Sequence, residues 1–322
     1  MNRIIGWMLA ALTLGNAQAR VIEDATMERP EGQRHYLVQQ PDSSNGSKRP
    51  LVILLHGHGA SAAQLMGKTA FGGYRSDAWP MLAQREGIVL MAPQGLVASD
   101  GKAAWNDCKA DSTTNPASDD TAFISALIDT AIARYNADPG RIYVYGGSNG
   151  GTMAYRLGIE LGARLAAIAA QSALMPANSL CPAPRHPLPV WISHGTDDKI
   201  APYGGGKLGS WMLKGRGAGL GAEESVAVWR KLAGLPDAAD VYRFPHLQPG
   251  DDTAATRYTW GQDPAGLQVV FVKVDGGGHV HASKTESLPW LLGKLVGDMN
   301  HDLDTEQEVW AFFKDKRAAA HP

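Results

Sequence analysis

The sequence predicts an α/β protein with a mostly parallel sheet and helices on both faces. Strand-like apolar runs alternate with helix-like runs along the chain, and this alternation is typical of parallel sheets. The strand-like runs lie at residues 35–40, 51–55, 88–92, 141–145, 166–171, 190–194 and 268–274. The clearest helix-like runs cover residues 120–135 and 149–161. In a sheet of this kind, a ligand site is expected at the carboxyl edge.

The first residues have the pattern of a secretory signal peptide. A short basic start precedes an apolar run at residues 4–14, and Ala17 and Ala19 form an A-x-A cleavage pattern. We therefore expect residues 1–19 to be removed and the mature protein to be secreted or periplasmic. The apolar run is shorter than the roughly 20 residues that a spanning helix needs, and we expect no membrane span.

Residues 20–322 are expected to form a single catalytic domain. The chain has 322 residues, and α/β sheets reach this size as one unit. We find neither a linker that divides it nor an internal repeat. A glycine-rich segment at residues 204–221 contains Trp211 and is a candidate lid over the site.

A serine is predicted to lie on a sharp strand-to-helix turn. The strand-like run 141–145 leads into Gly-Gly-Ser-Asn-Gly-Gly, in which Gly146, Ser148 and Gly150 form the pattern G-x-S-x-G. Small flanking residues let such a serine adopt a strained backbone and project its hydroxyl above the sheet. A glycine-rich turn that merely contains a serine is the alternative, so the prediction depends on finding partners for Ser148.

The partners of a nucleophilic serine are a histidine that takes its proton and a carboxylate that orients the histidine. In α/β-hydrolases they follow the serine in the order acid, then histidine, at the ends of strands. Here run 190–194 leads to the adjacent Asp197 and Asp198, and run 268–274 leads through three glycines to His279. The order predicts His279 as the base and leaves two candidates for the acid.

The oxyanion that forms during acyl transfer needs two backbone N–H donors. We expect one from Asn149, directly after the serine, and one from His58, in the loop after run 51–55. A metal site was considered, because five histidines could converge on zinc: His56, His58, His194, His279 and His281. The hydrolase pattern already accounts for these positions, and we expect no metal.

Charge and cysteine content limit the partners further. The net charge is −2 without a basic footprint, and no nucleotide-binding fingerprint is present, so we expect neither nucleic acid nor a cofactor. The sequence leaves the oligomeric state open. Cys108 and Cys181 are the only cysteines, and in a secreted protein the simple interpretation is one disulfide. Two unpaired thiols are the alternative.

The segment from His194 to Gly205 resembles the H-G-T-x-D-x-x-x-P-Y-x-G-G segment of the polyhydroxybutyrate depolymerase and feruloyl esterase family. The resemblance implies that Asp198 completes the triad and that Asp197 is a solvated neighbour. Further similar segments lie at residues 54–57, 105–106, 119–124, 147–157, 276–279 and 302–313. In one place the chain departs from the family, which commonly has an aromatic residue and a proline just after the catalytic histidine. Here His281 lies in that region.

The motifs and the resemblance together imply a secreted carboxylic-ester hydrolase that works through an acyl-enzyme at Ser148. Candidate substrates are small, oligomeric or polymeric esters: hydroxyalkanoates, or feruloyl and acetyl esters of plant polysaccharide. A secreted serine peptidase of the same fold and a catalytically silent carbohydrate-binding relative are the alternatives. Trp105, Trp191 and Trp211 are candidates to line the pocket, although tryptophans are more often packed in cores. His281 is either a neighbour of the leaving-group pocket or a solvated loop residue.

Overall fold

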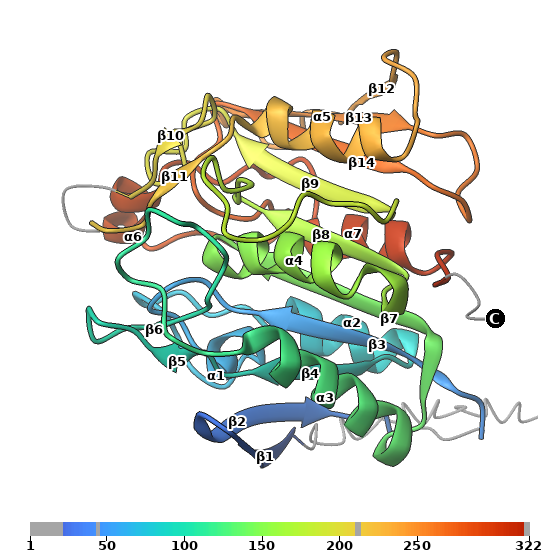
Figure 1. Ribbon diagram of the computed structural model, residues 1–322. Coiled ribbons are helices and arrows are strands. Elements are labelled where there is room, and N and C mark those ends of the chain that lie inside the picture. The colour runs from blue at the N-terminus through green and yellow to red at the C-terminus, as the bar shows by residue number, and fades with distance from the viewer. Residues whose placement is uncertain (1–21, 43–45, 210–213, 319–322) are drawn as a thin grey trace, which may run out of the picture.

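The computed structural model describes residues 22–42, 46–209 and 214–318 (Figure 1). The predicted signal peptide, residues 1–19, and Trp211 of the predicted lid lie outside these ranges. The described residues form a twisted ten-stranded sheet with helices on both faces, and this confirms the predicted fold class. No helix in the described ranges is long and apolar enough to cross a bilayer.

The sheet has a parallel centre and antiparallel edges. In spatial order its strands are β1 (Ile22–Arg29), β2 (Gly32–Gln39), β4 (Val89–Pro93), β3 (Arg49–Leu55), β7 (Ala137–Gly147), β8 (Ala167–Gln171), β9 (Val190–Gly195), β14 (Val269–Asp275), β13 (Ala254–Trp260) and β12 (Asp240–Arg243). The six strands from β4 to β14 run parallel, so their carboxyl ends lie at one edge. The outer pairs on each side are antiparallel.

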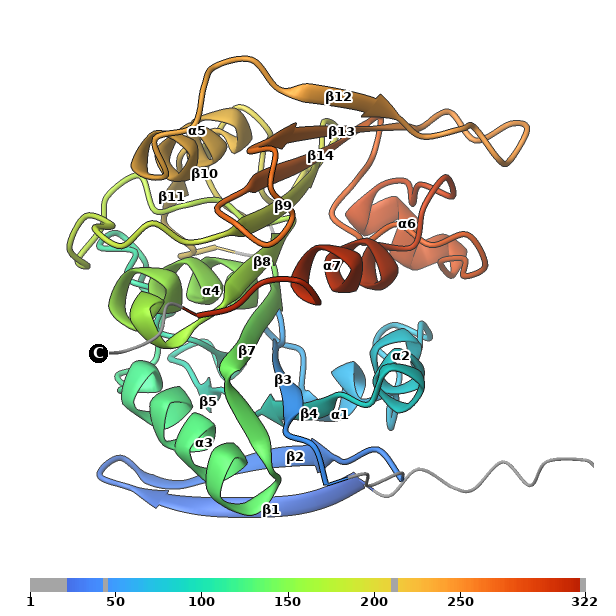
Figure 2. The ribbon, with the colours of Figure 1, turned by 90° about the vertical axis from the view of Figure 1, so that its right-hand side faces the viewer.

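Helices cover the two faces in separate groups (Figure 2). One face carries α3 (Asp120–Arg134), α4 (Asn149–Glu160) and α5 (Ala222–Leu232). The other carries α1 (Ala62–Leu65), α2 (Ala78–Glu86), α6 (Trp290–Val296) and α7 (Thr305–Phe313). A 3₁₀ turn, η1 (Gly162–Arg164), follows α4, and two short hairpins pair β5 (Leu96–Val97) with β6 (Ala103–Ala104) and β10 (Gly206–Lys207) with β11 (Ala218–Gly219).

Strand β3 shows why both faces need helices. Successive side chains of a strand point to opposite faces. Leu51 and Ile53 pack in the core beneath α3, α4 and α5, whereas Val52 and Leu54 pack in the core on the side of α2 and α7. An uninterrupted apolar run of this kind is typical of a strand that is buried on both sides.

All seven predicted strand-like runs overlap strands of the sheet, and both predicted helix-like runs correspond to α3 and α4. Three strands of the antiparallel edges, β1, β12 and β13, were not predicted from the sequence. Helices α1, α2, α5, α6 and α7 were not predicted either.

Candidate active site

Ser148 lies in the strained turn that the sequence predicts. It connects β7 to α4 with φ 54° and ψ −123°, and its N–H donates to the Gln171 carbonyl at 2.9 Å. A Cβ at position 150 would lie only 2.2 Å from the Leu55 carbonyl oxygen, so glycine is required there. A Cβ at position 146 would meet the Gly150 carbonyl oxygen at 2.1 Å. The two glycines of the motif therefore allow helix and strands to approach closely enough to form the turn.

His279 and Asp198 form a hydrogen-bonded pair at the carboxyl edge. The Nδ1 atom of His279 donates to Oδ2 of Asp198 at 2.7 Å. The other carboxylate oxygen accepts the N–H groups of Ile200 and Ala201 at 2.8 and 2.7 Å. Burial alone would raise the pKa of Asp198, but the adjacent His279 and these hydrogen bonds lower the pKa below its ordinary value. Asp198 is therefore an ionised acceptor that fixes the orientation of the His279 ring.

Asp197 has a different environment from its neighbour. Its side chain is exposed, and its carboxylate accepts a hydrogen bond from the Thr196 hydroxyl at 3.1 Å. The geometry therefore favours Asp198 over Asp197 as the partner of His279.

The structure places Ser148 at the same edge as this pair, at the end of β7, whereas Asp198 follows β9 two strands away. Among the described residues, the Ser148 hydroxyl makes no hydrogen bond, to His279 or to any other group. Hydrogen bonds between a nucleophile and its base are often long in a ligand-free site and shorten when substrate binds. The arrangement is compatible with a triad of Ser148, Asp198 and His279.

His194 is a supporting residue to which the sequence analysis gave no role in the triad. Its buried ring donates from Nε2 to the Ala201 carbonyl at 2.7 Å and lies 3.4 Å from Oδ2 of Asp198. Burial lowers the pKa of His194, so the imidazole is neutral. It holds in place the turn that presents Asp198. Its position at the end of β9, four residues before the acid, is the sequence signal that could have identified it.

Two backbone N–H groups are available as oxyanion donors. In the described part of the chain, neither the Asn149 nor the His58 N–H has an acceptor of its own. The loop of His58 lies against Ser148, because a Cβ at Gly57 would lie 3.5 Å from Cβ of Ser148. The His58 side chain is directed elsewhere, with Nε2 at 2.8 Å from the Asp100 carboxylate. Only the main-chain N–H of His58, and not its side chain, is therefore a candidate oxyanion donor.

The buried imidazole of His56 fixes the same loop. Burial lowers the pKa of His56 to about 4, so the ring is neutral. Its Nδ1 donates to the Gly57 carbonyl at 2.7 Å, and its Nε2 accepts the Gly95 N–H at 3.0 Å. His56 thus has a structural role in this loop.

Trp105 does not line a pocket, contrary to one sequence prediction. Its side chain is completely buried, and its indole N–H donates to the His56 carbonyl at 2.8 Å. Its main-chain N–H donates to Oδ1 of Asn149 at 2.8 Å, and the Asn149 amide donates to Asp107 at 2.7 Å. Trp105 therefore links the two segments that carry the candidate oxyanion donors. The same correction applies to Trp191, which is 1% exposed and packs in the core on the side of α2 and α7.

The environment of His281 contradicts one of its two sequence interpretations, the solvated loop residue. The ring is mostly buried, with Nε2 at 3.2 Å from Glu286 and Nδ1 at 3.2 Å from Glu306. The Tyr74 hydroxyl lies 2.5 Å from Nε2 and donates to Glu286. His281 is therefore not a solvated loop residue, and both ring nitrogens are engaged within the protein rather than free for a substrate.

The two cysteines are paired. Cys108 and Cys181 form a disulfide with a Cα–Cα distance of 5.6 Å. It connects the loop that contains Asp107 to the segment that follows β8. The Glu160 carboxylate lies beside the two sulfurs, but bonded sulfurs are not the thiolates that a metal binds. The predicted disulfide is thus confirmed over the alternative of two free thiols.

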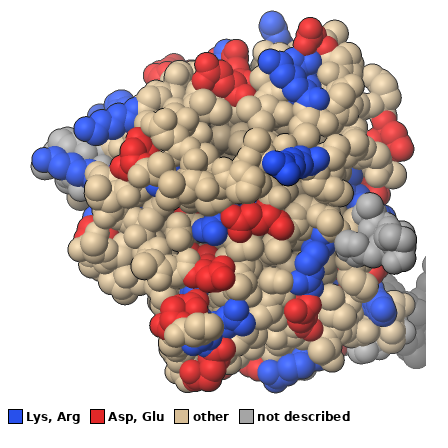
Figure 3. Space-filling view, in the orientation of Figure 1, with Lys and Arg blue, Asp and Glu red and all other residues tan. Residues whose placement is uncertain are grey.

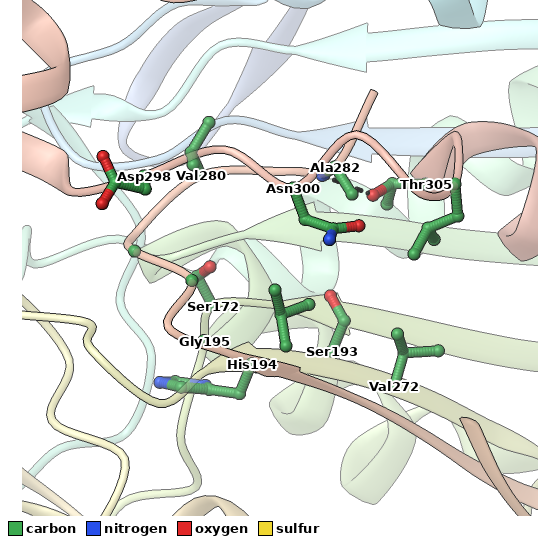
Figure 4. Close-up of a pocket in the computed structure, with 14 residues that line it drawn as sticks. Ser172, Ser193, His194, Gly195, Val272, Val280, Ala282, Asp298, Asn300 and Thr305 are labelled. Carbon is green, nitrogen blue, oxygen red and sulfur yellow. Dashed lines mark hydrogen bonds between the residues drawn. The ribbon is translucent and has the colours of Figure 1, made fainter. Parts of the chain in front are cut away.

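Two cavities lie near these residues. The first has a volume of about 10 Å³ and lies between β9, β14 and residues 298–305 (Figure 4). Ser193 and His194 lie on one side of it, and Ala282 and Asn300 on the other. This space is large enough for about one water molecule. The second cavity, of about 380 Å³, extends along α4 beside the disulfide, and its walls are mainly apolar. Neither Ser148 nor His279 lines either cavity.

The parallel sheet, the two helical layers and the serine turn at the carboxyl edge define the α/β-hydrolase fold. The chain belongs to the phospholipase/carboxylesterase family, whose sequence pattern matches residues 37–217.

Three proteins that are similar to this chain carry esterase names. NocK of Nocardia uniformis subsp. tsuyamanensis is 27% identical over 72% of this chain and 65% of its own length. The bifunctional acetylxylan esterase/xylanase XynS20E of Neocallimastix patriciarum is 26% identical over 82% of this chain and 33% of its own. Feruloyl esterase B of Piromyces equi is 28% identical over 76% of this chain and 42% of its own length. The chain thus spans between a third and two thirds of these relatives.

A solved structure shares the fold over nearly the whole chain. The acetyl xylan esterase from Aspergillus awamori superimposes with a TM-score of 0.60, covering 92% of this chain and 99% of that one. The two sequences are 14% identical, so this likeness concerns the fold alone.

Proposed function

We propose that this protein is a serine-dependent carboxylic-ester hydrolase that works through an acyl-enzyme. The observation that carries the proposal is the hydrogen bond of 2.7 Å between His279 and the buried Asp198, at the edge where the strained turn presents Ser148. Such a pair has the chemistry to remove a proton from a serine hydroxyl. The resemblance to the polyhydroxybutyrate depolymerase and feruloyl esterase family and the esterase relatives support the same proposal.

In the proposed reaction, Ser148 attacks the ester carbonyl while His279 accepts its proton. Asp198 keeps the Nδ1 proton on His279 and stabilises the imidazolium that forms. The N–H groups of Asn149 and His58 bind the oxyanion of the tetrahedral intermediate. His279 then protonates the leaving alcohol, and a water activated by the same residue releases the acid from the serine ester.

The proposed substrates are carboxylic esters of three kinds: acetyl esters of plant polysaccharide, feruloyl esters, and hydroxyalkanoate oligomers or polymers. The names of the acetylxylan and feruloyl esterase relatives favour the first two. The resemblance of the 194–205 segment favours the third. We further propose that the protein is one catalytic domain, secreted or periplasmic after removal of residues 1–19. The disulfide supports this location, since disulfides persist in oxidising compartments.

A substrate panel tests the proposal. The purified protein is assayed on p-nitrophenyl acetate and butyrate, methyl ferulate, acetylated xylan, hydroxybutyrate oligomers and peptide anilides. We expect hydrolysis of the p-nitrophenyl esters and of at least one natural ester class, without turnover of peptide anilides. Preferential cleavage of anilides would replace the esterase proposal by a peptidase. If the folded protein turns over none of these substrates, the alternative of a catalytically silent carbohydrate-binding protein is favoured.

A further inference from the structure

Helix α6 exposes apolar side chains to solvent. Trp290 is 75% exposed, Leu291 67% and Leu295 45%, and Phe71 on an adjacent turn is 46% exposed. We call these four residues the apolar patch. The turn that carries Phe71 packs against the helix, because a Cβ at Gly72 would lie 3.5 Å from the Leu292 side chain. Soluble proteins rarely leave several large apolar side chains exposed side by side without a function for them.

The apolar patch lies next to the candidate active site. The His279 N–H donates to the carbonyl of Val296, the last residue of α6, at 2.5 Å. The Gly278 N–H donates to the Asp298 carbonyl at 2.9 Å. Figure 1 shows α6 beyond the carboxyl ends of the parallel strands, where β9 ends. A surface that bound the apolar patch would thus also lie close to His279.

Exposed cations lie on the two segments that carry the apolar patch. Lys68, Arg75, Lys284 and Lys294 lie on the two segments that carry it, residues 68–75 and 284–295, and all four are exposed. The Lys294 ammonium lies 5.8 Å from the centre of the Trp290 ring. The two segments contain a single carboxylate, Glu286, which already faces His281 and Tyr74. This local excess of positive charge occurs on a chain whose net charge is −2.

The face drawn in Figure 3 gives a contrast, since acidic and basic side chains are interspersed over much of it. Such a mixture is typical of an ordinary solvated surface. The two segments of the apolar patch instead combine exposed aromatic and aliphatic side chains with cations alone, apart from the paired Glu286.

We propose that the apolar patch is a docking surface for a lipid layer with anionic headgroups. Trp, Phe and Leu side chains enter the boundary between headgroups and acyl chains, and nearby lysines are attracted to the anionic surface. A neutral polyester would use the apolar side chains but not the cations. A second copy of the chain would bring like charges together. The proposed function explains why docking would be useful, because docking brings esters to Ser148. Binding to the lipid layer itself does not depend on catalysis.

Vesicle flotation tests the proposal. The full chain is mixed with vesicles of phosphatidylcholine alone or of phosphatidylcholine with phosphatidylglycerol, and the floated fraction is measured at low and high salt. We expect binding to the anionic vesicles that salt weakens. Trp290→Ala/Leu291→Ser and Lys284→Glu/Lys294→Glu should each lower the partition coefficient roughly tenfold or more. Matched controls are Leu247→Ser, where the leucine is 52% exposed, and Lys48→Glu, before β3.

The controls should bind anionic vesicles as the unchanged protein does, and all variants should keep its thermal melting point. Binding equal to both vesicle types, or unaffected by the patch variants, would overturn the proposal. Two other results would also overturn it, if anionic vesicles are not bound. One is adsorption to polyhydroxybutyrate particles that depends on Trp290, and the other is dimerisation in gel filtration that depends on Trp290. Turnover of p-nitrophenyl butyrate is measured in parallel. Vesicle binding without turnover would count against the proposed function alone, and turnover without vesicle binding against docking alone.

Discussion

At the scale of single residues, the two adjacent aspartates give a sharp test. Asp198 is buried against His279, whereas Asp197 is exposed. We predict that Asp198→Asn lowers kcat about 10⁴-fold, because an amide at this position favours the wrong tautomer of His279. Asp197→Asn is the matched control and should retain kcat within a small factor. Steady-state kinetics on p-nitrophenyl butyrate measures both, and the reverse ranking would transfer the role of the acid to Asp197.

The Asn149 side chain provides a second test, because it anchors the residue whose N–H we propose as an oxyanion donor beside Ser148. Its amide bonds to Trp105 and Asp107. We predict that Asn149→Ala lowers kcat roughly 10- to 100-fold with little change in KM, since a displaced donor weakens transition-state binding more than substrate binding.

The control is Asn115→Ala, which removes a bond of 3.0 Å to the same Asp107 carboxylate without touching the serine turn. Equal losses in the two variants would mean that only the packing of the Asp107 loop matters.

At the scale of elements, His281 joins three parts of the chain. It lies two residues after His279, and its ring binds Glu286 in the same loop and Glu306 on α7, while Tyr74 comes from the turn before α2. A neutral imidazole has one N–H, so carboxylates at both nitrogens favour the imidazolium. Burial opposes the charge, but Glu306 and Glu286 outweigh it and raise the pKa of His281 to about 10.

The raised pKa predicts how stability depends on pH. The contribution of His281 is complete below the unfolded pKa of about 6.5 and is lost as pH rises through about 10. The melting temperature should therefore fall across this range, and His281→Gln should flatten the fall. At pH 6 the variant should be destabilised by roughly 3 kcal/mol, because it leaves the buried Glu306 carboxylate without its cationic partner. Calorimetry over the pH series measures both effects, and parallel curves would contradict the pairing.

The structure also shows which elements and contacts a sequence can reveal. The serine turn was predictable because strand, glycines and helix are consecutive in the chain, and the steric need for Gly146 and Gly150 is local. The edge strands β12 and β13 were not predicted. β12 is exposed throughout and polar at its ends, so its sequence lacks the apolar run of a central strand.

Contacts between residues that are distant in the sequence explain what could not be predicted for His281 and Trp105. The pairing of His281 with Glu306 joins residues 25 positions apart, and sequence alone does not show which carboxylate approaches the ring. Trp105 was expected at the pocket, but its burial depends on the packing of the loops of His56 and Asn149 around it. Asp198 could be chosen over Asp197 only through the resemblance, since the two are chemically identical.

At the scale of the whole molecule, the disulfide closes a loop with a sequence separation of 73 residues. The chain-entropy model gives it about 4 kcal/mol of stability. We predict that Cys108→Ser/Cys181→Ser lowers the melting temperature by roughly 6 °C, as expected for a domain of this size. Ser179→Ala, in the same segment, is the control for disturbance of the loop. An unchanged melting temperature in the double variant would contradict a stabilising role.

If Ser148 is the reactive serine of this fold, a covalent inhibitor should label it alone, and mass mapping of the labelled protein shows which residue reacts. The protein is reacted with diethyl p-nitrophenyl phosphate, digested and analysed by mass spectrometry. We predict one diethylphosphoryl group, on the peptide that contains Ser148, formed in parallel with the loss of ester turnover and absent from folded Ser148→Ala. A label on another residue that abolishes turnover, or full turnover by Ser148→Ala, would contradict the account.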